Sequence, residues 1–121
     1  MRGRAPAPQL LIIEDNVSIA TLVGEAFEEE GYRIAGYAKS VEQSLEMIKR
    51  CKFDLALLDA HLKESHSGPA AVELRKRNIP FILMTGSKDM VSSAHAGAPI
   101  ILKPFKMSEL LEAVGRLCAR H

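Results

Sequence analysis

Five short apolar runs, each separated from the next by a longer amphipathic stretch, constrain the fold of this chain more than any other feature. The runs are LLII (10–13), YRIAGYA (32–38), LALL (55–58), FILM (81–84) and IIL (100–102). Strands of a parallel sheet that helices cover on both faces are apolar without alternation, as most of these runs are. The run at 32–38 is more mixed and is predicted to be an edge strand. The pattern therefore predicts a buried parallel sheet.

The stretches between the runs have the periodicity of amphipathic helices. Between residues 16 and 30, one buried helix face is predicted by apolar residues at helical spacing, namely Ile19, Leu22, Val23, Ala26 and Phe27. Ser40, with Gln43 three residues later, has the signature of a capping box and predicts a second helix. Further helices are predicted at about 69–77, at 90–96, where the pattern is short and weak, and at about 107–119.

The alternation of strand and helix five times predicts an α/β fold with right-handed crossovers and a parallel sheet. Five units are too few for an eight-stranded barrel, so an open, doubly wound (βα)5 sheet is expected. In such sheets, ligands bind at the carboxyl ends of the strands. The residues that directly follow each run are therefore the candidates for function.

Length and charge narrow the possibilities further. The chain has 121 residues, which suits one domain, and its net charge of +1 gives no bulk attraction for nucleic acid or an anionic membrane. No run approaches the roughly 18 apolar residues that membrane insertion requires. We expect a disordered tail over 1–8, a domain over 9–121, and a cytoplasmic location, since no export signal is visible. Cys51 and Cys118 are expected to be free thiols.

Carboxylates, a hydroxyl and an amine follow the predicted strands. Glu14 and Asp15 follow the first, Asp59 the third, Thr85 the fourth and Lys103 the fifth. Each also has a simpler interpretation taken alone. Either Asp15 or Asn16 is suited to cap the helix that follows, Asp59 to start a turn, and Lys103 to be a solvated charge.

The simpler interpretations do not explain why three acids should converge on one edge. Like charges about 4 Å apart repel by some 4 kcal/mol at an effective dielectric near 20. Such a cluster needs shared protons or a cation. Lys103 offsets part of the repulsion, and a divalent metal offsets more. A site made of oxygen ligands, with room for water, favours Mg²⁺.

The segments LLIIEDN, LALLDAHL, ILMTGS and ILKPF, in this order and spacing, resemble the receiver domain of two-component response regulators over residues 9 to about 119. The resemblance implies a flavodoxin-like sheet of strand order 2-1-3-4-5. It implies that Asp59 accepts a phosphoryl group from a sensor histidine kinase or phosphotransfer protein. It also implies a phosphorylation-dependent surface that a downstream protein reads. With no output domain after it, the chain resembles the single-domain chemotaxis type.

The resemblance implies further roles at the site. Asp15 and Asp59 match direct magnesium ligands, Glu14 matches an acid that holds the metal through water, and the backbone carbonyl of His61 matches another ligand. Thr85 and Lys103 match the groups that bind the phosphoryl oxygens. A cis peptide bond before Pro104 is implied as well. The sequence carries no signal for the oligomeric state.

The chain also departs from the family pattern. Ile100 stands where the family usually has an aromatic switch residue, and we expect it to be plain strand packing. Lys63 replaces the usual proline after the acceptor, and Gly68 comes one residue late. The loop HLKESHSG (61–68) is long and polar. The side chains of His61 and Ser87 are expected to flank the site.

Two other function classes remain open from sequence alone. A dehalogenase-type phosphatase also has a nucleophilic aspartate at a strand end, but normally has a second aspartate two residues later, where this chain has His61. A degenerate receiver that only binds proteins is the other, and the presence of Asp15, Asp59 and Lys103 argues against it.

Overall fold

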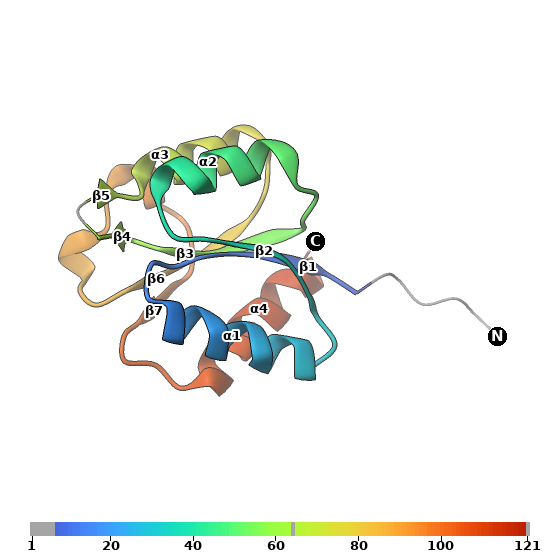
Figure 1. Ribbon diagram of the computed structural model, residues 1–121. Coiled ribbons are helices and arrows are strands. Elements are labelled where there is room, and N and C mark those ends of the chain that lie inside the picture. The colour runs from blue at the N-terminus through green and yellow to red at the C-terminus, as the bar shows by residue number, and fades with distance from the viewer. Residues whose placement is uncertain (1–6, 64, 121) are drawn as a thin grey trace.

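A central parallel sheet with helices on both faces forms the framework of the protein (Figure 1). The computed structural model describes residues 7–63 and 65–120. The five sheet strands are β1 (Gln9–Ile13), β2 (Arg33–Ala38), β3 (Leu55–Asp59), β6 (Phe81–Thr85) and β7 (Ile100–Leu102). Their order across the sheet is β2-β1-β3-β6-β7, with all pairs parallel, which confirms the predicted 2-1-3-4-5 order and the edge position of residues 32–38.

Helices cover both faces of this sheet (Figure 1). The helices are α1 (Val17–Glu29), α2 (Val41–Arg50), α3 (Gly68–Lys76) and α4 (Met107–Arg120). Helices α2 and α3 lie on one face, and α1 and α4 on the other. Ser40 caps α2 by accepting from the Gln43 N–H, while the Gln43 side chain accepts from the N–H of Lys39, one residue outside a standard capping box.

The apolar strands serve two separate cores because successive side chains point to opposite faces. Within β1, Leu10 and Ile12 face α1 and α4, whereas Leu11 and Ile13 face α2 and α3. Strands β3 and β6 alternate in the same way. This two-sided burial is the physical reason that these strands contain no polar alternation.

The prediction of a helix at 90–96 is wrong. The segment instead forms two three-residue 3₁₀ turns, η1 (Lys88–Met90) and η2 (Ser93–His95). Ser87 and Ser92 accept hydrogen bonds from backbone N–H groups two residues ahead of them, and such local bonds compete with continuous helix. The fourth crossover of the described chain therefore contains no α-helix.

Two side chains predicted to be packed are exposed. Leu22, placed on the buried face of the first helix, is 60% exposed, because the buried stripe of α1 runs through Ala20, Val23 and Phe27. Ile100 lies on strand β7 as predicted, but it is 39% exposed. Ile100 and Leu102 alternate with Ile101, which packs on the α1 and α4 side; the residue 88–99 segment offers no helix to cover the other two.

The polar loop after β3 contains a small hairpin that the sequence did not predict. Strands β4 (His61–Leu62) and β5 (Ser65–His66) pair antiparallel. Lys63, in the turn between them, has a φ of 54°, a conformation that few residues with a side chain adopt. Cys51 and Cys118 are free, as expected. Within the described ranges, no helix is long and apolar enough to cross a membrane.

Candidate functional site

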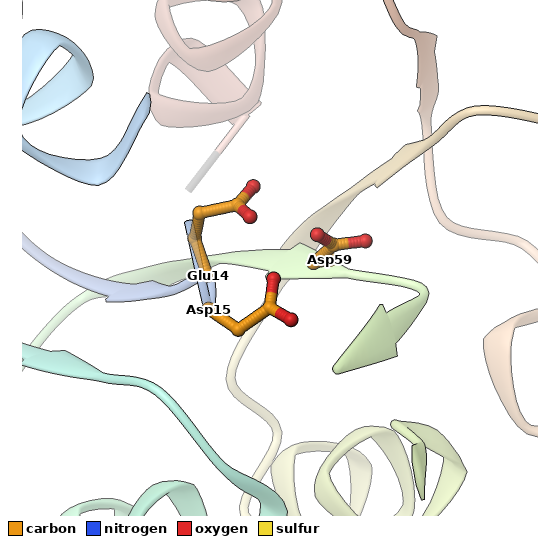
Figure 2. A group of neighbouring side chains, drawn as sticks. All are labelled: Glu14, Asp15 and Asp59. Carbon is orange, nitrogen blue, oxygen red and sulfur yellow. The ribbon is translucent and has the colours of Figure 1, made fainter. Parts of the chain in front are cut away.

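Three carboxylates meet at the carboxyl end of the sheet (Figure 2). Glu14 and Asp15 directly follow β1, and Asp59 is the last residue of the neighbouring strand β3. One oxygen from each of the three lies within 4.8 Å of the others. Glu14 and Asp59 are buried, and Asp15 is partly buried. The convergence that the sequence predicted from strand ends is thus present in the fold.

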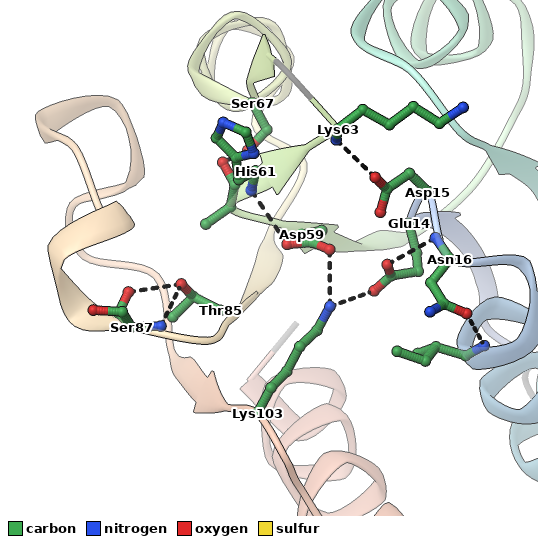
Figure 3. Close-up of polar contacts among 12 residues, drawn as sticks. Glu14, Asp15, Asn16, Asp59, His61, Lys63, Ser67, Thr85, Ser87 and Lys103 are labelled. Atoms are coloured by element: carbon green, nitrogen blue, oxygen red, sulfur yellow. Dashed lines mark hydrogen bonds and ion pairs between the residues drawn. The ribbon is translucent and has the colours of Figure 1, made fainter.

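Among the described residues, Lys103 provides the only cationic side chain that bonds to these carboxylates. Its ammonium donates to Glu14 Oε1 at 2.8 Å and to Asp59 Oδ2 at 2.9 Å (Figure 3). Strand β7 lies two strands away from β3 in the sheet, and the Lys103 side chain, which directly follows β7, points toward Asp59 and Glu14 (Figure 3). The Lys103–Pro104 peptide bond is cis, as predicted. Three acids around one amine leave the cluster with an excess of negative charge.

Burial and the neighbouring charges together shift the pKa values of the groups at this site. The pKa of Glu14 is raised to about 7, chiefly by burial and to a smaller extent by the negative charge of Asp59. Hydrogen bonds from Lys103 and from the Asn16 N–H act in the opposite direction but do not cancel burial. Burial alone would lower the pKa of Lys103, but its bonds to Asp59 and Glu14 outweigh that effect and raise it. Lys103 therefore stays charged.

The structure decides between Asp15 and Asn16 as the helix cap. Asn16 Oδ1 accepts from the Ile19 N–H at 3.0 Å and so caps α1. Asp15 is left to face the cleft, where its Oδ2 accepts from the backbone N–H of Lys63 at 2.7 Å. This bond from the β4–β5 turn is a contact that sequence reasoning missed, since it joins residues far apart along the chain and uses a backbone group.

Two other predicted site residues lie near the acids without completing the expected contacts. Thr85 ends β6, but its hydroxyl donates to the Ser87 carbonyl at 2.7 Å, on the side away from Asp59 (Figure 3). His61 is held through its backbone, because its N–H donates to Asp59 Oδ1 at 3.2 Å. Both residues therefore line the cleft, with Thr85 turned toward its own loop.

The donor set fits a hard divalent cation. All three side chains offer carboxylate oxygens, and among the described residues no histidine or cysteine side chain belongs to this group of candidate ligands. Oxygen-only sites suit Mg²⁺ and similar ions, and a second cation beside Lys103 would balance the excess charge.

Comparison with known proteins agrees with the fold and the cleft. Residues 10–115 match the response regulator receiver domain family. The chain is 34% identical over 116 residues to the sporulation initiation phosphotransferase F of Bacillus subtilis, with 88% of this chain and 90% of that protein covered. It is 32% identical over 111 residues to the transcriptional regulatory protein PdtaR of Mycobacterium tuberculosis, with 88% and 54% covered.

Among solved structures, the receiver domain of the sensor histidine kinase PA1611 from Pseudomonas aeruginosa superimposes with a TM-score of 0.78 at 26% identity, covering 91% of this chain and 96% of that one. That structure holds a magnesium ion in its active-site cleft. This chain belongs to the response regulator receiver domain family, a family of phosphoacceptor signalling modules rather than enzymes with a separate substrate. It spans about half the length of PdtaR.

Substitutions at Asn16 and Asp15 should separate the helix cap from the acid cluster. Asn16→Ala is expected to lower the free energy of unfolding by about 1 kcal/mol, because α1 loses its cap, and to keep the response to Mg²⁺. Asp15→Ala is expected to keep the cap and lose the rise in melting temperature that Mg²⁺ produces. Urea unfolding and thermal melts with and without Mg²⁺ measure both effects. A full Mg²⁺ response in Asp15→Ala would show that Asp15 is not a ligand.

Proposed function

We propose that Asp59 is the phosphoacceptor of this receiver domain and takes its phosphoryl group from the phosphohistidine of a sensor kinase or phosphotransfer protein. The observation that carries the proposal is the position of Asp59, buried at a strand end beside two further acids and bonded to Lys103. A carboxylate oxygen of Asp59 forms the new bond to phosphorus as the phosphorus–nitrogen bond of the donor breaks. The donor imidazole keeps the electron pair of that bond.

Charge neutralisation is what this transfer requires most, because an anion attacks a phosphorus that is surrounded by negative oxygens. Lys103 already contacts Asp59 and is placed to bind one of the incoming oxygens. Mg²⁺, when bound, supplies the remaining positive charge at the phosphoryl oxygens. Asp15, Asp59 and the His61 carbonyl would hold it directly, and Glu14 would hold it through water.

Thr85 provides a route from the modified site to the surface. A phosphoryl group on Asp59 adds negative charge and new acceptor oxygens. To donate to one of them, the Thr85 hydroxyl must give up its bond to the Ser87 carbonyl. The loop that begins at Gly86 would then move inward and shift the surface formed by residues 88–99 between two states that a downstream protein distinguishes.

The donor must cover the rim around Asp59 in order to deliver its phosphoryl group. Next to Lys103 lies an apolar groove of about 430 Å³, between α1 and the start of α4. It is lined mainly by Ile19, Leu22, Val23, Phe105 and Met107. The exposed Leu22 side chain is therefore placed where an apolar helix face of a donor would pack.

The proposal extends to the organisation of the chain. Residues 9–121 would form the receiver domain, in the cytoplasm, where kinases have access to ATP. The alignment with the sporulation phosphotransferase, which covers 88% of this chain, supports this extent of the domain. Of the predicted tail at 1–8, residues 1–6 lie outside the described part of the chain.

Intact-mass measurement after incubation with Mg²⁺ and acetyl phosphate or phosphoramidate tests the proposal. We expect a gain of one phosphoryl group per chain, and no gain when EDTA removes the metal. Turnover of many equivalents of a phosphate ester would favour a phosphatase instead. No gain with any donor would favour a receiver that only binds proteins.

A further inference from the structure

His95 is a buried histidine that lies outside the acid cleft and plays no part in the chemistry above. It belongs to η2 in the crossover without an α-helix, and its side chain is fully buried. Its Nε2 lies 3.0 Å from the hydroxyl of Ser67, which is also fully buried. Ser67 in turn donates through Oγ to the carbonyl of Ala60 at 2.9 Å. Ala60 is the residue that directly follows Asp59.

The directions of these hydrogen bonds fix the protonation of His95. A serine hydroxyl has one proton, and that of Ser67 goes to the Ala60 carbonyl, so Ser67 Oγ must accept from Nε2–H. The Ser92 N–H donates to Nδ1 at 3.1 Å, so Nδ1 must carry a lone pair. His95 is therefore neutral with its proton on Nε2. Burial, followed by the charges of His66 and Arg75, lowers its pKa and agrees with this state.

The chain from Ala60 through Ser67 to His95 is one of few anchors of the residue 88–99 segment. Arg75 of α3 provides another, donating through its guanidinium to the carbonyls of Ala94 and Ala96. Apolar contacts from Val91, Ala94 and Ala98 complete the packing of this segment on the α2 and α3 side. A segment that lacks an α-helix of its own thus takes its position from side chains of neighbouring elements.

The residue 88–99 segment is therefore connected to the site in two places, at Thr85 and at the peptide after Asp59. Thr85 lies at the end of β6, where the connection to β7 begins. In the middle of that connection, His95 contacts Ser67, and Ser67 donates to the carbonyl of Ala60, the residue after Asp59. We propose that Ser67 and His95 form a positioning pair that transmits a change at Asp59 to residues 88–99 through the Ala60 carbonyl. The pair would thus be a second connection, besides Thr85, between Asp59 and residues 88–99. Position 100 holds isoleucine, so no aromatic ring is present there to act as a switch. This inference rests on the proposed function of Asp59.

Amide chemical shifts measured with Mg²⁺ and beryllofluoride, a mimic of the phosphoryl group, test this pair. In the unmodified protein, we expect the amides of 85–87 and of 92–98 to shift. In Ser67→Ala and His95→Leu, we expect the shifts at 92–98 to fall below half, while those at 85–87 persist through Thr85. Intact mass should still show one phosphoryl group, since the carboxylates and Lys103 are unchanged.

His95→Gln and Ser93→Ala provide the matched controls. Glutamine keeps one donor for Ser67 and one acceptor for the Ser92 N–H, so His95→Gln should restore the shifts at 92–98. Ser93 has an exposed side chain in the same turn, and its substitution should change nothing. If His95→Leu does not fold, as judged by its melt, Ser67→Ala and His95→Gln carry the comparison.

Shifts at 92–98 of full size in the folded Ser67→Ala and His95→Leu variants would overturn the coupling, as would their absence in the unmodified protein. A protein that accepts no phosphoryl group at all would instead overturn the function proposed for Asp59, and the coupling with it.

Discussion

Asp59→Asn is expected to abolish the gain of one phosphoryl group that acetyl phosphate produces in the presence of Mg²⁺. An amide is a far weaker nucleophile than a carboxylate and carries no charge to share with a cation, so the loss should be complete at the sensitivity of intact-mass measurement. Asparagine preserves the size of the side chain and an acceptor for the His61 N–H, so the fold should be retained.

Asp54→Asn is the matched control for this prediction. Asp54 lies just before the opposite end of the same strand and is exposed, where it accepts from the Gln9 N–H. Its substitution should leave the phosphoryl gain complete. Undiminished modification of Asp59→Asn, with the phosphoryl group mapped to another peptide, would place the acceptor elsewhere and contradict the proposed site.

Mg²⁺ affinity is expected to increase by about tenfold between pH 6 and pH 8. Burial holds the pKa of Glu14 at about 7, so below that pH most molecules carry a proton on this carboxyl group. A proton and the metal compete for the same site, because the cation requires the ionised cluster. The ionised fraction of a group with that pKa rises about tenfold over this interval, and apparent affinity follows it.

Titration calorimetry is suited to this measurement, because the chain contains no tryptophan to report binding by fluorescence. At pH 6, in buffers that differ in ionisation heat, Mg²⁺ binding should release close to one proton. Glu14→Gln should bind Mg²⁺ more weakly and lose most of the pH dependence between pH 6 and pH 8. An affinity that is constant with pH in the unmodified protein would mean that Glu14 does not face the metal.

The framework of the fold was predictable because its signals are local. The runs at 10–13, 55–58 and 81–84 are buried on both faces, and such strands must be apolar at every position. The helix at 16–30 could be placed by its spacing, although Leu22 was assigned to the wrong side of it. Residues 88–99 could not be assigned correctly, because their conformation depends on the hydroxyls of Ser87 and Ser92, on hydrogen bonds from Arg75, and on the contact of His95 with Ser67.

Strand ends made the acid cluster predictable as well. The carboxyl ends of parallel strands share one edge, so the order of strands was enough to bring Glu14, Asp15 and Asp59 together. No local signal distinguished Asp15 from Asn16 as the helix cap. No sequence pattern predicted the hydrogen bond from the Lys63 N–H to Asp15 or the contact of His95 with Ser67. Each of these depends on a partner distant in sequence or on a backbone group.

By itself, the sequence determined the α/β architecture and the set of charged groups at one edge of the sheet. The apolar pattern of each short segment indicates its burial, and parallel strands all end at the same edge. Only the tertiary structure decided which way each polar group points: Lys103 between two acids, Thr85 toward Ser87, and His95 toward Ser67. Hydrogen-bond partners are chosen by distance and direction in space, and those quantities exist only after the chain has folded.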